Sequence, residues 1–144
     1  MTTHKGGCLC GAVRFEVTGE PILSGTCYCR DCQIVSGGAA AYGMMFPVDA
    51  LTIVKGEVKV SVVKAASGSD VFRHFCPECG VHLISHNSAN SEFRAVKVGV
   101  LDDPSWFRSE GNIWIGSAQP WHRIDPDVPS HETQPCLEQR GSAE

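Results

Sequence analysis

The chain has 144 residues, of which 42% are hydrophobic and 19% are charged, values that are ordinary for a folded, water-soluble chain. Its 12 Lys and Arg against 16 Asp and Glu give a net charge of −4, which argues against a protein that chiefly binds nucleic-acid phosphates. No apolar run approaches the ~20 residues of a membrane-spanning helix, and the N-terminal sequence lacks a signal-peptide core. We therefore expect a cytoplasmic protein with neither a nucleic acid nor a membrane as its partner.

The predicted elements are mostly short β-strands, in keeping with 15 glycines and 8 prolines. Alternating or β-branched apolar residues predict strands over 13–17, 51–54, 58–63, 71–75, 81–84 and 93–100. The segment 55–57 is predicted to be a hairpin turn, and one short helix is predicted over 30–35 because Gly37-Gly38 would end it. Few apolar residues follow Trp121, so we expect a single domain over 1–132 and a disordered tail over 133–144.

Eight cysteines are unusual for a chain expected in the cytoplasm, and they are clustered. They stand at positions 8, 10, 27, 29, 32, 76, 79 and 136. In a reducing compartment, clustered cysteines indicate metal ligands or redox groups before they indicate disulfides. Cys136 lies in the predicted tail, outside the clusters, and is expected to be an exposed thiol without a catalytic role.

One predicted metal site combines the motifs CLC and CPEC. In CPEC, Pro77 fixes the turn and the glycine after Cys79 permits a left-handed backbone, as in a zinc knuckle. The missing pair of ligands is expected from Cys8 and Cys10, because residues i and i+2 of an extended segment point to one side. Four thiolates from Cys8, Cys10, Cys76 and Cys79 would close a tetrahedral structural zinc site. The alternative is a redox dithiol at CPEC.

The second cluster, CYCRDC, offers three thiolates, from Cys27, Cys29 and Cys32. Three protein ligands with one open position are typical of a reactive zinc site, and three thiolates suit a soft sulfur ligand better than water. A substrate thiol is therefore the expected fourth ligand. The alternatives are a metal-free redox relay, or a second structural site closed by a histidine from the set His74, His82 and His86.

Residues beside the second cluster are candidates for substrate binding. Arg30 could offset the negative charge of a bound thiolate, and Ser36 and Gly37 could offer backbone amides to a carboxylate, although Gly37-Gly38 could equally be only a helix stop. Three tryptophans could line a pocket, but core packing is the favoured interpretation for all of them: Trp106, Trp114 and Trp121.

These motifs together resemble one known family. The segments that carry the resemblance are 6–13, 27–32 with 36–37, 75–80, 98–104, 113–114 and 120–121. In this order and spacing, the chain is similar to the glutathione-dependent formaldehyde-activating enzyme (GFA) family, which includes centromere protein V, over roughly residues 5–129.

The resemblance implies a mainly β, tent-like fold of small antiparallel sheets held by a structural zinc, with one short helix. It also implies two zinc ions per chain, one on each cysteine cluster. The founding activity joins glutathione and formaldehyde into S-hydroxymethylglutathione, a carbon–sulfur lyase reaction in reverse. Many members carry histidine where this chain has Tyr28 and Asn112, a difference that bears on proton transfer and on the choice of substrate.

Three functions are compared on this basis. The favoured one is a zinc-dependent, carbon–sulfur lyase-like enzyme acting on an adduct of glutathione, or another small thiol, with an aldehyde. The second is a non-catalytic binding module on the same zinc-stabilised scaffold. The third, a reductase related to methionine-R-sulfoxide reductases, needs a nucleophilic cysteine off the metal, and only Cys136 lies outside both clusters.

Overall fold

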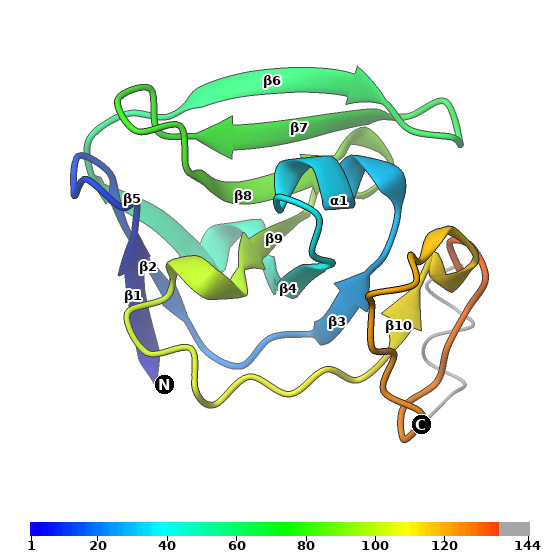
Figure 1. The fold of residues 1–144 in the computed structure, drawn as a ribbon. Helices are drawn as coiled ribbons and strands as arrows, with labels where there is room; N and C mark the ends of the chain where they lie inside the picture. Colours follow the sequence, from blue (N-terminus) through cyan, green and yellow to red (C-terminus); the bar gives the residue numbers. More distant parts are fainter. Residues whose placement is uncertain (136–144) are drawn as a thin grey trace. The chain divides into compact units, whose positions relative to one another are not determined.

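The computed structural model describes residues 1–135, so Cys136 and the rest of the predicted tail beyond Pro135 lie outside the described residues. The chain divides into two compact units, Met1–Leu23 with Gly43–Phe107 and Ser24–Tyr42 with Arg108–Glu144. Short strands dominate and the described part contains one α-helix, which confirms the predicted fold class (Figure 1). Within residues 1–135, no helix has the length and apolar character that crossing a membrane requires.

The first unit contains a three-stranded antiparallel sheet at its N-terminal end. It consists of β1 (Thr3–Gly7), β2 (Arg14–Thr18) and β5 (Leu51–Lys55), in the order β1–β2–β5. The period of two in β2 sends Phe15 and Val17 to the buried face, while residues 14, 16 and 18 stay partly or fully exposed. The predicted strand over 13–17 is thus present, displaced by one residue.

A longer run of antiparallel strands completes the first unit. The strand β4 spans Ala41–Pro47, and its residues from Gly43 onward belong to this unit. The members of the run pair in the order β4, β9 (Phe93–Lys97), β8 (His82–Asn87), β7 (Asp70–Phe75) and β6 (Lys59–Lys64). The strands β6 and β7 form a long hairpin (Figure 1), with Lys59 opposite Phe75 and Lys64 opposite Asp70.

The hydrophobic core of the first unit includes sulfur atoms of the predicted metal site. Its buried members are Cys8, Val13, Phe15, Val17, Met44, Phe46, Cys76, Leu83, Ile84, Val96, Val98 and Leu101. Cys76 is fully buried and Cys8 is 7% exposed. The first cysteine of each motif is therefore held by core packing as well as by its own turn.

Two predictions about local structure are wrong. Residues 55–57 do not form a hairpin turn, because β5 pairs with β2 whereas β6 pairs with β7. Gly56 instead has φ of +75° and lies so close to Ala12 that a Cβ would stand 2.1 Å from its carbonyl oxygen. The strand predicted over 93–100 ends at Lys97, and Val98–Val100 form a 3₁₀ turn.

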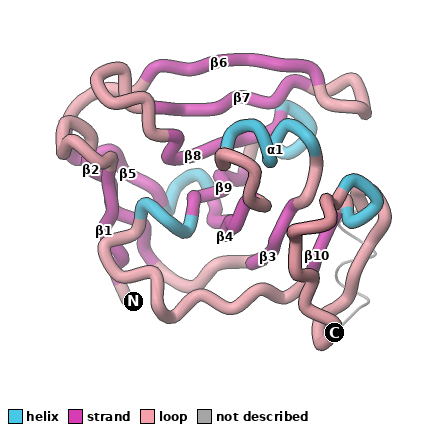
Figure 2. Tube along the Cα trace, in the orientation of Figure 1, coloured by secondary structure: helices cyan, strands magenta, loops and turns pink. Residues whose placement is uncertain are grey.

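The second unit has little regular structure, and Figure 2 shows most of its C-terminal part as loop. It contains β3 (Leu23–Cys27), α1 (Arg30–Val35) and the two-residue strand β10 (Asn112–Ile113), which is parallel to β3. The helix has the predicted bounds. Residues 133 and 134 accept hydrogen bonds from the backbone N–H and the indole N–H of Trp114, respectively.

Buried polar side chains connect the segments of the second unit. Thr26, Gln33 and Asn112 are at most 4% exposed, and each forms hydrogen bonds. Because a buried polar group without a partner is costly, these side chains fix the loops around them.

Candidate metal centres

The first unit brings together the four cysteines of the motifs CLC and CPEC, which are Cys8, Cys10, Cys76 and Cys79. Their four sulfur atoms all lie within 4.8 Å of one another. The Sγ atoms of Cys8 and Cys10 are 3.6 Å apart, and those of Cys10 and Cys76 are 3.8 Å apart. No disulfide joins any of the cysteines within residues 1–135. We call these four residues the four-cysteine cluster.

Two similar turns hold this cluster. In the first, the Val13 amide donates to the Cys8 sulfur at 3.2 Å, and Cys8 N–H donates to the Val13 carbonyl at 3.1 Å. In the second, the Cys79 amide donates to the Cys76 sulfur at 3.5 Å, and Gly80, with φ of +76°, donates to the Cys76 carbonyl. Amide hydrogens directed at sulfur stabilise thiolates, so the backbone itself prepares the site for a cation.

The pKa values of two of these thiols, Cys8 and Cys10, move in opposite directions because their sulfurs share hydrogen bonds. Burial alone would raise the pKa of Cys8, but the Val13 amide and the neighbouring thiols lower it to about 6. The pKa of Cys10 rises to about 11, since burial and the neighbouring thiols outweigh a hydrogen bond from the Ala12 backbone. One thiolate forms readily and opposes the next, and a bound cation would relieve this repulsion.

The second unit brings together Cys27, Cys29 and Cys32, which we call the three-cysteine cluster. Their sulfur atoms also lie within 4.8 Å of one another, and all three residues are half-buried. Cys27 ends β3, Cys29 is the N-cap of α1, and Cys32 lies in the first turn of the helix. The Cys29 sulfur accepts a hydrogen bond from the Cys32 amide at 3.3 Å, so helix capping sets this pair.

The three sulfurs of this cluster lie close enough to oppose one another's ionisation, and a bound cation would relieve that repulsion. Hydrogen bonds with the thiols of Cys29 and Cys32, followed by burial, raise the pKa of Cys27 far above its usual value. In the described part of the chain, no histidine, aspartate or glutamate belongs to this metal-binding group. His74 and His86, two of the candidates for closing it, instead bond to each other at 3.0 Å in the first unit.

The residues predicted to bind substrate lie on α1 and at its end. Arg30 Nη1 donates to Gln33 Oε1 at 2.5 Å. The amides of residues 36, 37 and 38 donate to the carbonyls of Cys32, Ile34 and Gln33, so they terminate the helix. A substrate-binding role for Ser36 and Gly37 remains a prediction. Their backbone amides already donate to carbonyls of the helix, which does not favour their binding a substrate.

Two residues stand where the resembling family often has histidine. Tyr28 is 4% exposed, and its hydroxyl donates to the Arg123 carbonyl at 3.3 Å. Asn112 is 1% exposed, and its Nδ2 donates to the Asp125 carbonyl at 3.0 Å and to Ser130 Oγ at 3.1 Å. Both side chains therefore hold the loop that follows residue 120.

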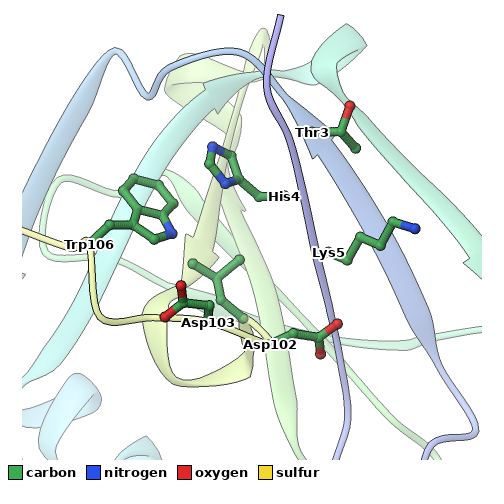
Figure 3. A pocket seen from close by; sticks show the side chains of 7 residues that line it. Thr3, His4, Lys5, Asp102, Asp103 and Trp106 are labelled. Carbon is green, nitrogen blue, oxygen red and sulfur yellow. The ribbon is translucent and has the colours of Figure 1, made fainter.

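A pocket of about 410 Å³ lies in the first unit, between β1 and the loop after residue 100. Figure 3 shows its lining, in which His4 stacks on Trp106 with ring centroids 4.3 Å apart. Asp102, also in the lining, accepts hydrogen bonds from both terminal nitrogens of Arg14, one of them at 2.9 Å. None of the predicted site residues lines this pocket. Trp106 also packs on the core, whereas Trp121 is 62% exposed, contrary to the core position expected for it.

The fold and the two sulfur clusters define a small, mainly β protein with two potential thiolate metal sites. A model of the family described as "Glutathione-dependent formaldehyde-activating enzyme" matches residues 3–117, and the chain belongs to this GFA family. The resemblance inferred from the cysteine motifs is thereby confirmed.

Curated relatives support this membership. The chain is 38% identical over 84 residues to a protein of Halomonas elongata, covering 55% of this chain and 53% of the relative. It is 30% identical over 104 residues to a protein of Penicillium rubens, covering 69% and 53%. Each is named "Putative glutathione-dependent formaldehyde-activating enzyme". The chain thus spans about half the length of these relatives.

A solved structure has the same overall fold. A crystal structure of a Rhodobacter sphaeroides protein superposes with a TM-score of 0.55 at 22% identity. The match covers 88% of this chain and 98% of that one.

Proposed function

We propose that this chain joins a small thiol, glutathione or a relative of it, to an aldehyde such as formaldehyde. The reaction is of the S-hydroxymethylglutathione synthase type, a carbon–sulfur lyase reaction in reverse. One observation carries the proposal: the three-cysteine cluster presents three half-buried sulfurs and, among residues 1–135, no histidine or carboxylate that would complete the set. Family membership supports the choice of thiol and aldehyde. Clustered thiols favour the cytoplasm, where they stay reduced.

Zinc is the metal we propose for both clusters, because tetrahedral sulfur sites favour it. Cys8, Cys10, Cys76 and Cys79 would hold a structural zinc, and Cys27, Cys29 and Cys32 would hold a reactive one. When bound there, the reactive zinc would supply the positive charge that keeps a substrate thiol ionised.

The chain's own residues would bring the two reactants together. Overall, the thiol sulfur forms a bond to the aldehyde carbon, the carbonyl becomes a hydroxyl, and the thiol proton ends on its oxygen. This addition needs no oxidant or reductant, so binding and orienting the two reactants would be enough to accelerate it. We propose that Arg30, held by Gln33 within the three-cysteine motif, attracts the anionic substrate. Ser36 and Gly37 stay binding candidates only through groups other than their backbone amides, which end the helix.

The test combines metal analysis, spectroscopy and kinetics. We expect two zinc ions per chain, and one per chain in a folded Cys32→Ser variant. Glutathione added to cobalt-substituted protein should produce a new sulfur-to-metal charge-transfer band, and that variant should lack it. The protein should also accelerate S-hydroxymethylglutathione formation above the rate in buffer. If wild-type protein gives neither the band nor the acceleration, the proposal fails.

The alternative is a non-catalytic binding module stabilised by zinc. The observation that favours it is Tyr28, whose buried hydroxyl donates to a backbone carbonyl at the position where the family resemblance leads us to expect histidine. Under this alternative, small thiols would leave the cobalt spectrum unchanged.

A further inference from the structure

Gln33, on α1, is a buried polar side chain with unusually complete hydrogen bonding. It is 1% exposed. Its Nε2 donates to the carbonyls of Tyr28 at 2.7 Å and Ser117 at 2.9 Å. Its Oε1 accepts from Arg30 Nη1 at 2.5 Å and from Gln119 Nε2 at 3.3 Å. Both donors and both acceptor positions of the amide are thus used, which also fixes its orientation.

These four bonds meet at the three-cysteine cluster. Tyr28 is the residue between Cys27 and Cys29, and Gln33 follows Cys32 on the helix. The Tyr28 backbone is held on both sides, since its N–H donates to the Ile113 carbonyl at 3.0 Å and its carbonyl accepts from Gln33. One side chain therefore ties the backbone between two of the sulfurs to the helix that carries the third.

Two of the four bonds connect Gln33 to a segment that is distant in the sequence. Ser117 and Gln119 are more than 80 residues from Gln33 in the sequence, and both bond to its amide group. The loop that contains them is also bonded to the end of α1, where the Gly38 carbonyl lies 3.0 Å from Trp121 Nε1 and 2.8 Å from His122 Nε2. His122 Nδ1 accepts a hydrogen bond from the backbone N–H of Gln119. The hydrogen of the neutral ring is therefore on Nε2, which donates to the Gly38 carbonyl.

We propose that Gln33 is a positioning residue for the three-cysteine cluster: it holds the three sulfurs in place and directs Arg30. The purpose of this arrangement rests on the proposed function, but the arrangement itself can be tested without activity. An apolar side chain of equal size would fill the volume and leave the Tyr28 and Ser117 carbonyls unpaired in a buried place, which is costly. The segment 27–29 would then open more often.

The test compares Gln33→Met with Asn112→Leu. Asn112 is a suitable control because it is also a 1% exposed amide of the second unit that donates to a backbone carbonyl, but its side chain bonds to residues 125 and 130. The full-length protein, as purified, is treated with iodoacetamide, and mass spectrometry gives the alkylation rate of each cysteine. Cobalt spectra are recorded in parallel, and bands are assigned to the three-cysteine cluster by their loss in Cys32→Ser.

We expect Gln33→Met to raise the alkylation rates of Cys27, Cys29 and Cys32 by about tenfold, the effect of losing one or two net hydrogen bonds. The rates at the four-cysteine cluster should not change. The assigned cobalt bands should shift in Gln33→Met and not in Asn112→Leu. Unchanged rates and bands in Gln33→Met, or equal changes in Asn112→Leu, would overturn the proposal.

Gln33→Glu covers the case in which Gln33→Met does not fold. Glutamate keeps the shape and the acceptors for Arg30 and Gln119 but loses the donors to the two carbonyls. The same local acceleration is expected, and its absence would refute the role. Because neither readout requires turnover, the proposal can stand even if the protein proves to be inactive toward glutathione and formaldehyde.

Discussion

Gly7 connects β1 to the four-cysteine cluster, and the substitution Gly7→Ala tests how tightly the cluster is built. A Cβ at this position would stand 2.5 Å from the Val13 carbonyl oxygen and 2.7 Å from Arg14 Cδ, whereas ordinary contacts begin at 3.4 Å. The Val13 carbonyl cannot move freely, because it accepts from Cys8 N–H, and the Val13 amide bonds to the Cys8 sulfur. The added methyl group must therefore displace the turn that carries two of the sulfurs.

Overpacking of this kind costs about 1–3 kcal/mol. Taking about 2 kcal/mol, and roughly 4 °C per kcal/mol for a chain of this size, we expect the melting temperature to fall by about 8 °C. The zinc proposed for the four-cysteine cluster should also be removed at a lower chelator concentration.

Gly99→Ala is the matched control, because no heavy atom lies within 4 Å of its added Cβ and its φ is not in the left-handed range. Thermal unfolding is followed by circular dichroism, with and without chelator. If Gly7→Ala and Gly99→Ala melt together and retain metal equally, the clash does not constrain the turn and the reasoning is refuted.

Three further predictions concern stability. If the four-cysteine cluster holds the proposed structural zinc, Cys76→Ser should unfold the first unit, which circular dichroism would detect. Structural zinc contributes roughly 10–16 kcal/mol in small peptides, against roughly 5–15 kcal/mol for the stability of a whole domain. The arginine beside Asp102 holds the pKa of that carboxyl below its usual value, so Asp102→Asn should lower the urea midpoint slightly at pH 7. The difference should vanish as pH falls through the lowered pKa. Burial lowers the pKa of His74 and His86, so protonating them opposes folding and the stability should decline as pH falls below about 6.5. The urea midpoint of His86→Gln should therefore vary less with pH than that of the wild type.

The sequence predicted those elements whose signal is local. The helix over 30–35 was predicted at its observed bounds because a glycine pair follows it, and Gly37 and Gly38 do have φ of +70° and +101°. Strands with β-branched or alternating residues were also found near their predicted positions. These signals need only neighbouring residues, so they do not depend on the rest of the fold.

Other strands carried no such signal. The residues of β1, THKGG, include a single buried position, Gly6, where a Cβ would stand 2.6 Å from the Phe15 ring. The strand β1 exists because its backbone pairs with β2. Gly6, which has no side chain, allows the Phe15 ring to lie against the backbone of β1. Similarly, β5 and β6 are adjacent in sequence but pair with different partners. Pairing between distant segments cannot be derived from composition or periodicity.

The candidate site shows the same division. Cysteine spacing was sufficient to group Cys8 and Cys10 with the CPEC pair, and CYCRDC into a second set, and the sulfur positions agree with both groupings. Spacing could not indicate Gln33, because its role depends on the Ser117 carbonyl and the Gln119 side-chain amide, both distant in the sequence. It also could not show that the amides after α1 are used to end the helix.

The two clusters are held by different kinds of interaction, and this difference is consistent with different roles. Cys8 and Cys76 belong to the hydrophobic core of the first unit, so displacing them would disturb packing as well as metal binding. The three-cysteine cluster is half-buried, and the side chain that supports it, Gln33, acts through directional hydrogen bonds to loops. Local openings occur most readily where apolar contacts are few. A site that must admit and release a thiol is better served by the second arrangement, whereas a site that maintains the fold is better served by the first.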